Sequence, residues 1–260
     1  MKVVILAGGF GTRISEESAF RPKPMIEIGG MPILWHIMKT YSAQGFHEFV
    51  ICAGYKQHMI KEWFADYFLH TSDITFDYTG GKNEMIVHDK RAEPGRVTVV
   101  DTGLNTQTGG RVKRIQNYIG DEPFMLTYGD AVGDVDIHAL LEFHKAHGRI
   151  GTVSMYNFGQ NKGVVEAGSD GEITAFREKS DMDGDLINIG FMVFQPEVFD
   201  CIDGDGTILE KGTLTKLVER KQLMGYVHRG YWQCMDTLRE KQQLEQLWES
   251  GRAPWKQWEE

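Results

Sequence analysis

A glycine-rich loop and two cationic side chains lie close together near the start of the chain. Residues 6–13 read LAGGFGTR, and residues 22–25 read PKPM. A loop with so few side chains lets backbone N–H groups approach phosphate oxygens closely. Arg13 adds a guanidinium that can bind a phosphate with two hydrogen bonds, and Lys23 adds a mobile point charge. The pattern predicts a binding site for a phosphorylated small molecule.

Two commoner phosphate-binding loops do not fit these residues. A Walker A loop needs the pattern GxxxxGK[ST], which the sequence lacks. A dinucleotide-binding loop needs GxGxxG, but Ile14 stands where its third glycine would be, which disfavours a nicotinamide-dependent oxidoreductase. A plain strand–helix turn with surface cations is the simpler alternative, and the combination of Arg13 with Lys23 argues against it.

The elements around the loop predict an α/β fold. Residues 2–7 form a short apolar run, typical of a strand buried on both faces of a sheet. Apolar residues then recur at helical spacing over 32–45, where Pro32 can begin a helix and Gly45 can end it. A strand at 49–53 and a helix at 57–69 continue the alternation. We therefore expect a mixed, mainly parallel sheet flanked by crossover helices.

The pattern changes after residue 70. Short β-type runs separated by Gly80-Gly81 and Pro94-Gly95 predict an inserted β-rich arm at about 71–101. We expect one domain over 1–260, with a first part at 1–150 that includes the arm and a more β-rich part with C-terminal helices at 151–260. The remaining predicted elements are helices at 111–119, 136–148, 196–202, 213–221 and 237–249, and strands at 124–127, 151–156, 163–167, 173–178 and 187–194.

Composition and charge exclude several classes of protein. The 260 residues carry a net charge of −9, with 41% hydrophobic residues, whereas a nucleic-acid-binding domain is usually basic. Three cysteines without a CxxC motif make a disulfide scaffold or a cysteine-ligated zinc site a poor interpretation. No apolar run approaches the ~20 residues of a membrane span, and no secretory signal is apparent. We expect a cytoplasmic protein that binds neither nucleic acid nor a membrane.

The pattern LAGGxGTR followed by PKPM resembles the signature of the sugar-nucleotide pyrophosphorylases, a family of nucleotidyltransferases. The resemblance implies a Rossmann-like α/β fold. It also implies transfer of a nucleotidyl group from a nucleoside triphosphate to a sugar 1-phosphate, with Arg13 and Lys23 as catalytic residues. The nucleotide-binding residues that it implies are Leu6, Ala7, Gly8, Gly9, Phe10, Gly11, Thr12, Arg13, Lys23, Thr106, Arg111, Tyr128 and Gly129.

Two aspartates match the magnesium site of this family. The run LTYGD ends in Asp130, and the run YWQCMDT at 231–237 contains Asp236. The resemblance implies that both bind Mg²⁺, and two carboxylates together with phosphate oxygens suit a hard cation. A helix N-cap is the plain alternative for Asp236, because Thr237 and Glu240 follow it at the start of a predicted helix. The sequence leaves the two interpretations open.

The sugar side also resembles the family, at 163–166 (GVVE), 173–179 (ITAFREK) and 187–190 (INIG). The resemblance implies that Glu178 accepts hydrogen bonds from sugar hydroxyls and that Lys179 reaches the sugar phosphate. It adds Gly163, Asn188 and Gly190 to the sugar-phosphate site. From residue type alone, Glu178 and Lys179 would be a solvated ion pair.

One branch of the family, the cytidylyltransferases that use glucose 1-phosphate, resembles the chain along nearly its whole length. The likeness is clearest in the arm and in the ending APWK at 253–256. It implies CTP and α-D-glucose 1-phosphate as substrates, CDP-glucose and pyrophosphate as products, Mg²⁺ as cofactor, and a role in lipopolysaccharide O-antigen biosynthesis. Nucleotide binding would fall to 1–150 and sugar-phosphate binding to 151–260. The alternatives are UTP, dTTP or another hexose 1-phosphate in the same chemistry, or a non-catalytic sugar-nucleotide-binding regulatory protein.

The resemblance also implies a homo-oligomer. The arm and the tryptophan-rich ending of the chain are the two segments that we single out as candidate subunit contacts. For Trp248, Trp255 and Trp258, packing on the protein's own core is an equally good interpretation.

Overall fold

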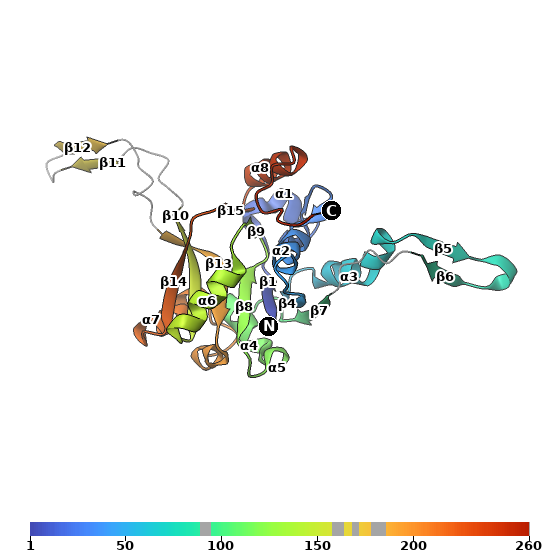
Figure 1. Ribbon diagram of the computed structural model, residues 1–260, viewed down its shortest axis with the longest axis horizontal. Helices are drawn as coiled ribbons and strands as arrows, with labels where there is room; N and C mark the ends of the chain where they lie inside the picture. The colour runs from blue at the N-terminus through green and yellow to red at the C-terminus, as the bar shows by residue number, and fades with distance from the viewer. Residues whose placement is uncertain (89–94, 158–163, 168–171, 178–185, 260) are drawn as a thin grey trace.

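The computed structural model describes residues 1–88, 95–157, 164–167, 172–177 and 186–259. A sheet of seven strands forms the centre of this part of the chain (Figure 1). All neighbouring strands run parallel except β13, which is antiparallel to both of its neighbours. The predicted mixed, mainly parallel sheet is thus confirmed. In spatial order its strands are β14 (Leu223–His228), β10 (Gly151–Asn157), β13 (Leu186–Phe194), β8 (Phe124–Tyr128), β1 (Val3–Ala7), β4 (Glu48–Ala53) and β7 (Arg96–Asp101).

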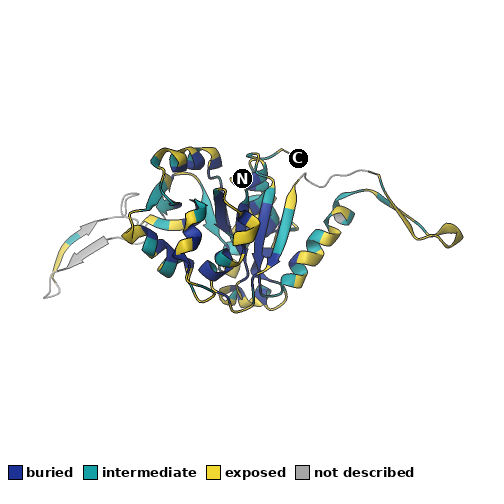
Figure 2. Ribbon diagram, turned by 90° about the horizontal axis from the view of Figure 1, so that it is seen from below, coloured by how far each residue is buried: buried dark blue, intermediate teal, exposed yellow. Residues whose placement is uncertain are grey.

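Helices cover both faces of the sheet (Figure 2). The predicted helix at 111–119 is divided at Ile115, and the one at 196–202 is a 3₁₀ helix, Pro196–Cys201. Among the described helices, none is long and apolar enough to cross a membrane. The α-helices are α1 (Ser15–Ser18), α2 (Ile33–Ser42), α3 (Gln57–Thr71), α4 (Thr108–Arg114), α5 (Gln116–Ile119), α6 (Ile137–His147), α7 (Thr215–Glu219) and α8 (Leu238–Glu249).

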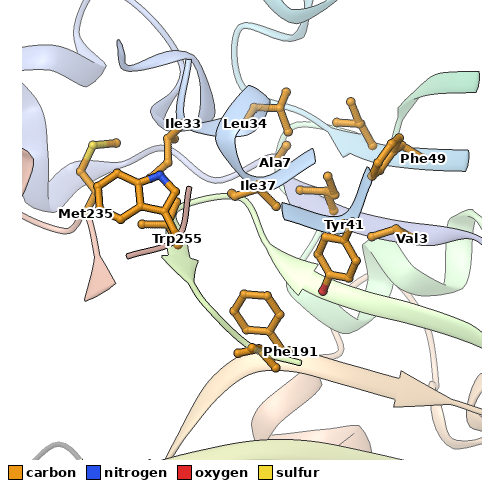
Figure 3. Packing of buried hydrophobic residues seen from close by; sticks show 14 of the residues in the cluster. Val3, Ala7, Ile33, Leu34, Ile37, Tyr41, Phe49, Phe191, Met235 and Trp255 are labelled. Atoms are coloured by element: carbon orange, nitrogen blue, oxygen red, sulfur yellow. The ribbon is translucent and has the colours of Figure 1, made fainter. Parts of the chain in front are cut away.

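The first strand is buried on both faces, as the sequence predicts. Val3, Ile5 and Ala7 pack in the core cluster that contains α2 and α6, and Figure 3 shows Val3 and Ala7 beside residues of α2. Val4 and Leu6 pack in the cluster on the other face, with α4 and α5. Alternate side chains of a strand point to opposite faces, so a strand covered on both sides needs an unbroken apolar run. This rigid strand leads directly into the glycine loop.

The inserted arm is shorter than predicted. β5 (Ile74–Asp77) and β6 (Glu84–Val87) form an antiparallel hairpin that projects from the body of the molecule beyond α3 (Figure 1). β7, which we expected in the arm, instead pairs parallel with β4 at the edge of the central sheet. Its valines contact both core clusters, and burying them in the sheet removes more apolar surface from water than an exposed hairpin would.

Four short strand pairs complete the described fold. Besides the arm hairpin, β11 (Val164–Ala167) pairs with β12 (Ile173–Arg177), close to the predicted bounds. β2 (Glu27–Ile28) pairs with β3 (Met31–Pro32), and β9 (Ala131–Gly133) pairs with β15 (Trp232–Cys234). The last pair matters most for function, because it brings the C-terminal part of the chain to the end of β8.

The C-terminal tryptophans pack on the protein's own core. Trp255 is fully buried, and its ring lies 6.4 Å from the ring of Trp248. The His36 ring of α2 lies 4.6 Å from that of Trp248, and Trp258 lies 5.7 Å from Trp35. The interpretation that these tryptophans pack on the protein's own core is therefore confirmed.

His36 lies at the centre of this aromatic cluster and is fully buried. Its Nδ1 accepts a hydrogen bond from Trp255 Nε1 at 3.4 Å, because an indole nitrogen can only donate. Its Nε2 then donates to the carbonyl oxygen of Ile28 at 2.8 Å. Both ring nitrogens are thus occupied in the neutral form, and burial lowers the pKa of His36 to about 4.

We expect the free energy of unfolding to fall as the pH is lowered from 6.5 towards 4. The unfolded chain protonates His36 below its ordinary pKa of 6.5, whereas the folded protein keeps it neutral down to about pH 4. At pH 5 this difference should cost about 2 kcal/mol of stability. Urea unfolding at pH 7 and pH 5 should show a smaller loss for His36→Gln than for the wild type. Equal losses in the two proteins would contradict this role of His36.

Candidate active site

The glycine loop after β1 is shaped by close contacts that glycine allows. A Cβ at Gly8 would lie 2.2 Å from Nη1 of Arg111, and one at Gly11 would lie 3.0 Å from Cβ of Ser18. Gly11 also has a φ of 67°, in the left-handed region that favours glycine. The loop lies close against its neighbours and lines a cavity of about 470 Å³.

All of the predicted nucleotide-binding residues line this cavity, and Asp130 lines it with them. β1 and β8 are parallel neighbours with Leu6 opposite Tyr128, so their carboxyl ends open at the same edge of the sheet. Ligands of open α/β sheets bind outside this edge. Residues distant in the sequence therefore meet where the fold class places a ligand.

Arg111 lies against the loop and joins several segments of the cavity wall. Burial lowers its pKa, but the ordinary value of 12.5 is so high that the group stays charged. Because its terminal nitrogens already bind the protein's own acceptors, Arg111 shapes the wall of the cavity, and its contact with a nucleotide stays a prediction. Nη1 and Nη2 donate hydrogen bonds of 2.7 to 3.3 Å to Thr102 Oγ1 and to the carbonyl oxygens of Gly8, Ala53, Gly103 and Leu104.

Lys23 lies between the two aspartates that the sequence singled out. Its Nζ is 2.6 Å from Oδ2 of Asp130 and 2.6 Å from Oδ1 of Asp236. Arg13 binds the other oxygen of Asp236, with Nη1 2.7 Å from Oδ2. The side chain of Lys23 is only 10% exposed, whereas that of Arg13 is 71% exposed. The buried Lys23 thus binds both carboxylates, and the exposed Arg13 shares one of them, Asp236.

Short pieces of backbone bring these side chains together. Lys23 opens a 3₁₀ turn, Lys23–Met25, directly after Pro22. Asp130 follows β8 and Asp236 follows β15, which pairs with β9. The amide of Met235 donates a hydrogen bond to the carbonyl oxygen of Asp130 at 2.8 Å. This pairing sets the two aspartates side by side.

The charges at this centre stabilise one another. Burial by itself would lower the pKa of Lys23, but Asp130 and Asp236 outweigh it, so the pKa is raised above 10.5. Burial by itself would raise the pKa of Asp236, but Lys23 and Arg13 outweigh it, so the pKa lies below 3.8. At neutral pH, Lys23 is therefore an ammonium and Asp236 a carboxylate.

The N-cap interpretation of Asp236 is wrong. The N-cap of α8 is Thr237, whose Oγ1 accepts a hydrogen bond from the amide of Glu240 at 3.3 Å. Glu240 Oε2 accepts one from the amide of Thr237 at 2.8 Å, which completes a capping box. The carboxylate of Asp236 is left free to bind Lys23 and Arg13.

Asp130 and Asp236 fit a divalent cation. Each places an oxygen 2.6 Å from the same ammonium nitrogen, so the two carboxylates converge on a point that already carries positive charge. Carboxylate oxygens are ligands that Mg²⁺ prefers. Within the described residues, no group of three or more His, Cys, Asp or Glu side chains gathers as a metal site. A cation between these two aspartates would thus take further ligands from water and a phosphorylated ligand, as Mg²⁺ commonly does.

Part of the predicted sugar-phosphate site can be placed. Asn188 and Gly190 lie on β13, beside Tyr128 of β8. A Cβ at Gly190, where φ is 85°, would lie 2.3 Å from Cδ2 of Tyr128, and Asn188 Nδ2 lies 3.5 Å from the Tyr128 hydroxyl. Gly163, Glu178 and Lys179 lie outside the described residues, so the sugar-phosphate site stays a prediction.

Glu210 is bonded to two residues that line this cavity, Tyr128 and Thr108, and we find no motif in the sequence that points to it. It accepts a hydrogen bond from the Tyr128 hydroxyl and, through Oε2, one from Thr108 Oγ1 at 3.0 Å. Burial, and then the charge of Glu210, raise the pKa of Tyr128 above its ordinary value of 10.0, so its phenol stays protonated. Glu210 belongs to a π-helical turn, Leu209–Leu214, and only the tertiary fold brings it to these partners.

A glycine loop, two cations and two converging carboxylates at the carboxyl edge of an α/β sheet define a nucleotide-binding protein equipped for phosphoryl chemistry. Comparison with known proteins is more specific. Residues 2–240 match the model of the nucleotidyl transferase family, and the chain belongs to this family.

Relatives of known name span the whole chain. It is 53% identical to the glucose-1-phosphate cytidylyltransferase of Salmonella typhimurium over 100% of both chains. It is 39% identical to the probable glucose-1-phosphate cytidylyltransferase of Bacillus subtilis, over 99% of this chain and 100% of that one. Among solved structures, a putative glucose-1-phosphate thymidylyltransferase from Bacillus anthracis matches with a TM-score of 0.68 and 17% identity, over 100% of this chain and 98% of that one. This last likeness confirms the fold.

Proposed function

We propose that this protein transfers a cytidylyl group from CTP to α-D-glucose 1-phosphate, giving CDP-glucose and pyrophosphate. The observation that carries the proposal is the Lys23 ammonium held between Asp130 and Asp236 beside a glycine-lined cavity. Such an arrangement suits a reaction that must bring two anions together. The full-length similarity to glucose-1-phosphate cytidylyltransferases supports the choice of substrates.

The reaction is an in-line displacement at the α-phosphorus of CTP. A phosphate oxygen of the sugar 1-phosphate forms the new bond to this phosphorus, and the bond to the bridging oxygen of pyrophosphate breaks. Since the attacking group is already an anion near neutral pH, no general base is required. The protein's task is to align two mutually repelling anions and to neutralise the charge that develops.

The residues of the cavity divide this task. The amides of the glycine loop hold the nucleotide and its phosphates. Lys23, fixed by two carboxylates, neutralises the α-phosphate or the departing pyrophosphate, and the exposed Arg13 binds the β- and γ-phosphates. Asp130 and Asp236 would hold Mg²⁺, which when bound supplies further positive charge to the phosphate oxygens.

The sugar phosphate is proposed to bind next to the end of β8. The contact between Asn188 and Tyr128 at 3.5 Å supports this, because Tyr128 lines the nucleotide cavity. In this proposal Asn188 and Gly190 form one wall of the sugar-phosphate site, to which Gly163 also belongs. Glu178 accepts hydrogen bonds from sugar hydroxyls, and Lys179 binds the sugar phosphate. The two parts of the chain, 1–150 and 151–260, would thus supply the nucleotide and sugar sides.

A panel of nucleotides tests the proposal. With glucose 1-phosphate and Mg²⁺, we expect pyrophosphate release from CTP at least about tenfold faster than from UTP, dTTP, ATP or GTP at equal concentration. Faster release from one of the others would keep the chemistry and overturn the choice of base. No release from any of them, by folded protein that still binds CTP in calorimetry, would contradict the enzymatic function and favour the regulatory alternative.

We further propose a homo-oligomer that works in the cytoplasm and whose product serves O-antigen synthesis. One observation supports the homo-oligomer and another supports the cytoplasm. For the homo-oligomer, apolar side chains on the arm are exposed, among them Phe76 at 53% and Tyr78 at 70%, and exposed apolar surface marks contact sites. Cys52, Cys201 and Cys234 are free thiols, as in a reducing compartment. Sedimentation should give a mass at least twice that of the 29.6 kDa chain, and the mass of a single chain would contradict the homo-oligomer.

A further inference from the structure

Glu210 connects two residues that line the cavity, Tyr128 and Thr108. One carboxylate oxygen accepts a hydrogen bond from Tyr128 at the end of β8, and the other accepts one from Thr108 at the start of α4. Thr108 lines the cavity directly after the loop 104–107. Tyr128 in turn contacts Asn188 of β13. A single carboxylate thus links a wall of the nucleotide cavity to the strand where the sugar phosphate is proposed to bind.

The direction of each hydrogen bond in this chain is fixed. A carboxylate can only accept, so the hydroxyls of Tyr128 and Thr108 both donate to Glu210. The Tyr128 oxygen is then free to accept from Asn188 Nδ2, at 3.5 Å, and Thr108 Oγ1 accepts from the amide of Leu209 at 2.8 Å. Asn188 Oδ1 accepts from the amide of Gly190 at 3.0 Å, which settles the orientation of its side chain amide.

Few other side chains could replace Glu210 at this position. The two hydroxyls bind different oxygens of Glu210, and a glutamine has an NH2 donor in place of one of them, so one hydroxyl would lose its acceptor. An aspartate keeps both oxygens but is one methylene shorter, so it would not span from α4 to β8 without movement. Reactions that align two substrates are sensitive to such movement, since a displacement of about 1 Å can cost about 100-fold in rate.

We propose that Glu210 is a positioning residue that sets the nucleotide and sugar-phosphate sides of the cavity relative to each other. The inference rests on the proposed function. Glu210 acts through Thr108 on the nucleotide side and through Tyr128 and Asn188 on the sugar side. Loss of this carboxylate should therefore affect the binding of both substrates, whereas loss of either hydroxyl partner should affect mainly one.

Steady-state kinetics of three variants test the proposal. We expect Thr108→Val to raise mainly the KM for CTP. Tyr128→Phe keeps the ring that lines the nucleotide cavity and removes only the hydroxyl that contacts Asn188, so it should raise mainly the KM for glucose 1-phosphate. Glu210→Gln should raise both KM values and lower kcat/KM by about 10- to 100-fold. The double variant Tyr128→Phe with Glu210→Gln should lose little more in kcat/KM for glucose 1-phosphate than Glu210→Gln alone, because both changes break the same chain.

Glu219→Gln is the matched control, because Glu219 is an exposed carboxylate at the end of α7 and its loss changes the net charge equally. It should leave both KM values unchanged. Glu210→Gln that lowers the thermal midpoint but leaves both KM values at wild-type levels would show a merely structural role and overturn the inference. Multiplying effects in the double variant would overturn it as well. An inactive wild type would overturn the proposed function and the inference with it. An active wild type, with unchanged KM values in Glu210→Gln, would overturn the inference alone.

Discussion

Lys23→Ala should lower kcat/KM by about 100-fold or more, as expected for the loss of a fixed cation that stabilises charge in the transition state. The reason lies in the position of Lys23, whose Nζ is held 2.6 Å from each of two carboxylates and whose side chain is only 10% exposed. Water cannot easily replace such a group. In the variant, Asp130 and Asp236 would also face the phosphates without the ammonium between them, and their repulsion adds to the loss.

Lys145→Ala is the control for this experiment. Lys145 lies on α6 with its side chain 63% exposed, paired with Glu142, so its loss removes the same charge far from the cavity. The control should keep wild-type turnover. Circular dichroism and a thermal melt should show that Lys23→Ala is folded at the assay temperature. A folded Lys23→Ala protein with near-normal turnover would remove Lys23 from the active site.

Asp236→Asn should raise the Mg²⁺ concentration needed for half-maximal activity by about tenfold or more. The substitution keeps the shape of the side chain but removes the charge that the structure directs towards Lys23 and Arg13. A Mg²⁺ titration of initial rates, at saturating substrates, measures the shift. An unchanged titration would exclude Asp236 as a metal ligand.

Thr237→Ala supplies a matched comparison one residue away. It removes the hydroxyl that caps α8 and should lower the free energy of unfolding by about 1 kcal/mol. Its Mg²⁺ titration should equal that of the wild type. The two neighbouring variants thus separate the helix cap from the metal site, since one should change stability and the other the need for Mg²⁺.

Much of the fold around the site could be predicted, because its signals are local. The apolar run before Gly8 identifies a strand buried on both faces, and the periodic apolar residues identify α2, α3, α6 and α8. The spacing of Arg13 and Lys23 after the glycine loop identified the side chains that lie beside the cavity. These inferences need only short stretches of sequence.

The rest depends on pairings between distant segments. No short stretch of sequence shows that β7 pairs with β4 in the central sheet and not within the arm. Nor does one show that β15 pairs with β9, which places Asp236 next to Asp130. On sequence alone, Asp236 could be either a metal ligand or the N-cap of the last helix, and the structure assigns the cap to Thr237 through the capping box. Glu210 belongs to a π-helical turn, and only the tertiary fold brings it to Tyr128 and Thr108.

Transfer of label from CTP tests the central claim most directly. The protein is supplied with CTP labelled with phosphorus-32 at the α-phosphate, together with glucose 1-phosphate and Mg²⁺, and the products are separated. In-line transfer at the α-phosphorus predicts that the label appears in CDP-glucose, with one unlabelled pyrophosphate released for each CDP-glucose formed. Label released as CMP, or label that stays in CTP bound to the folded protein, would contradict the account.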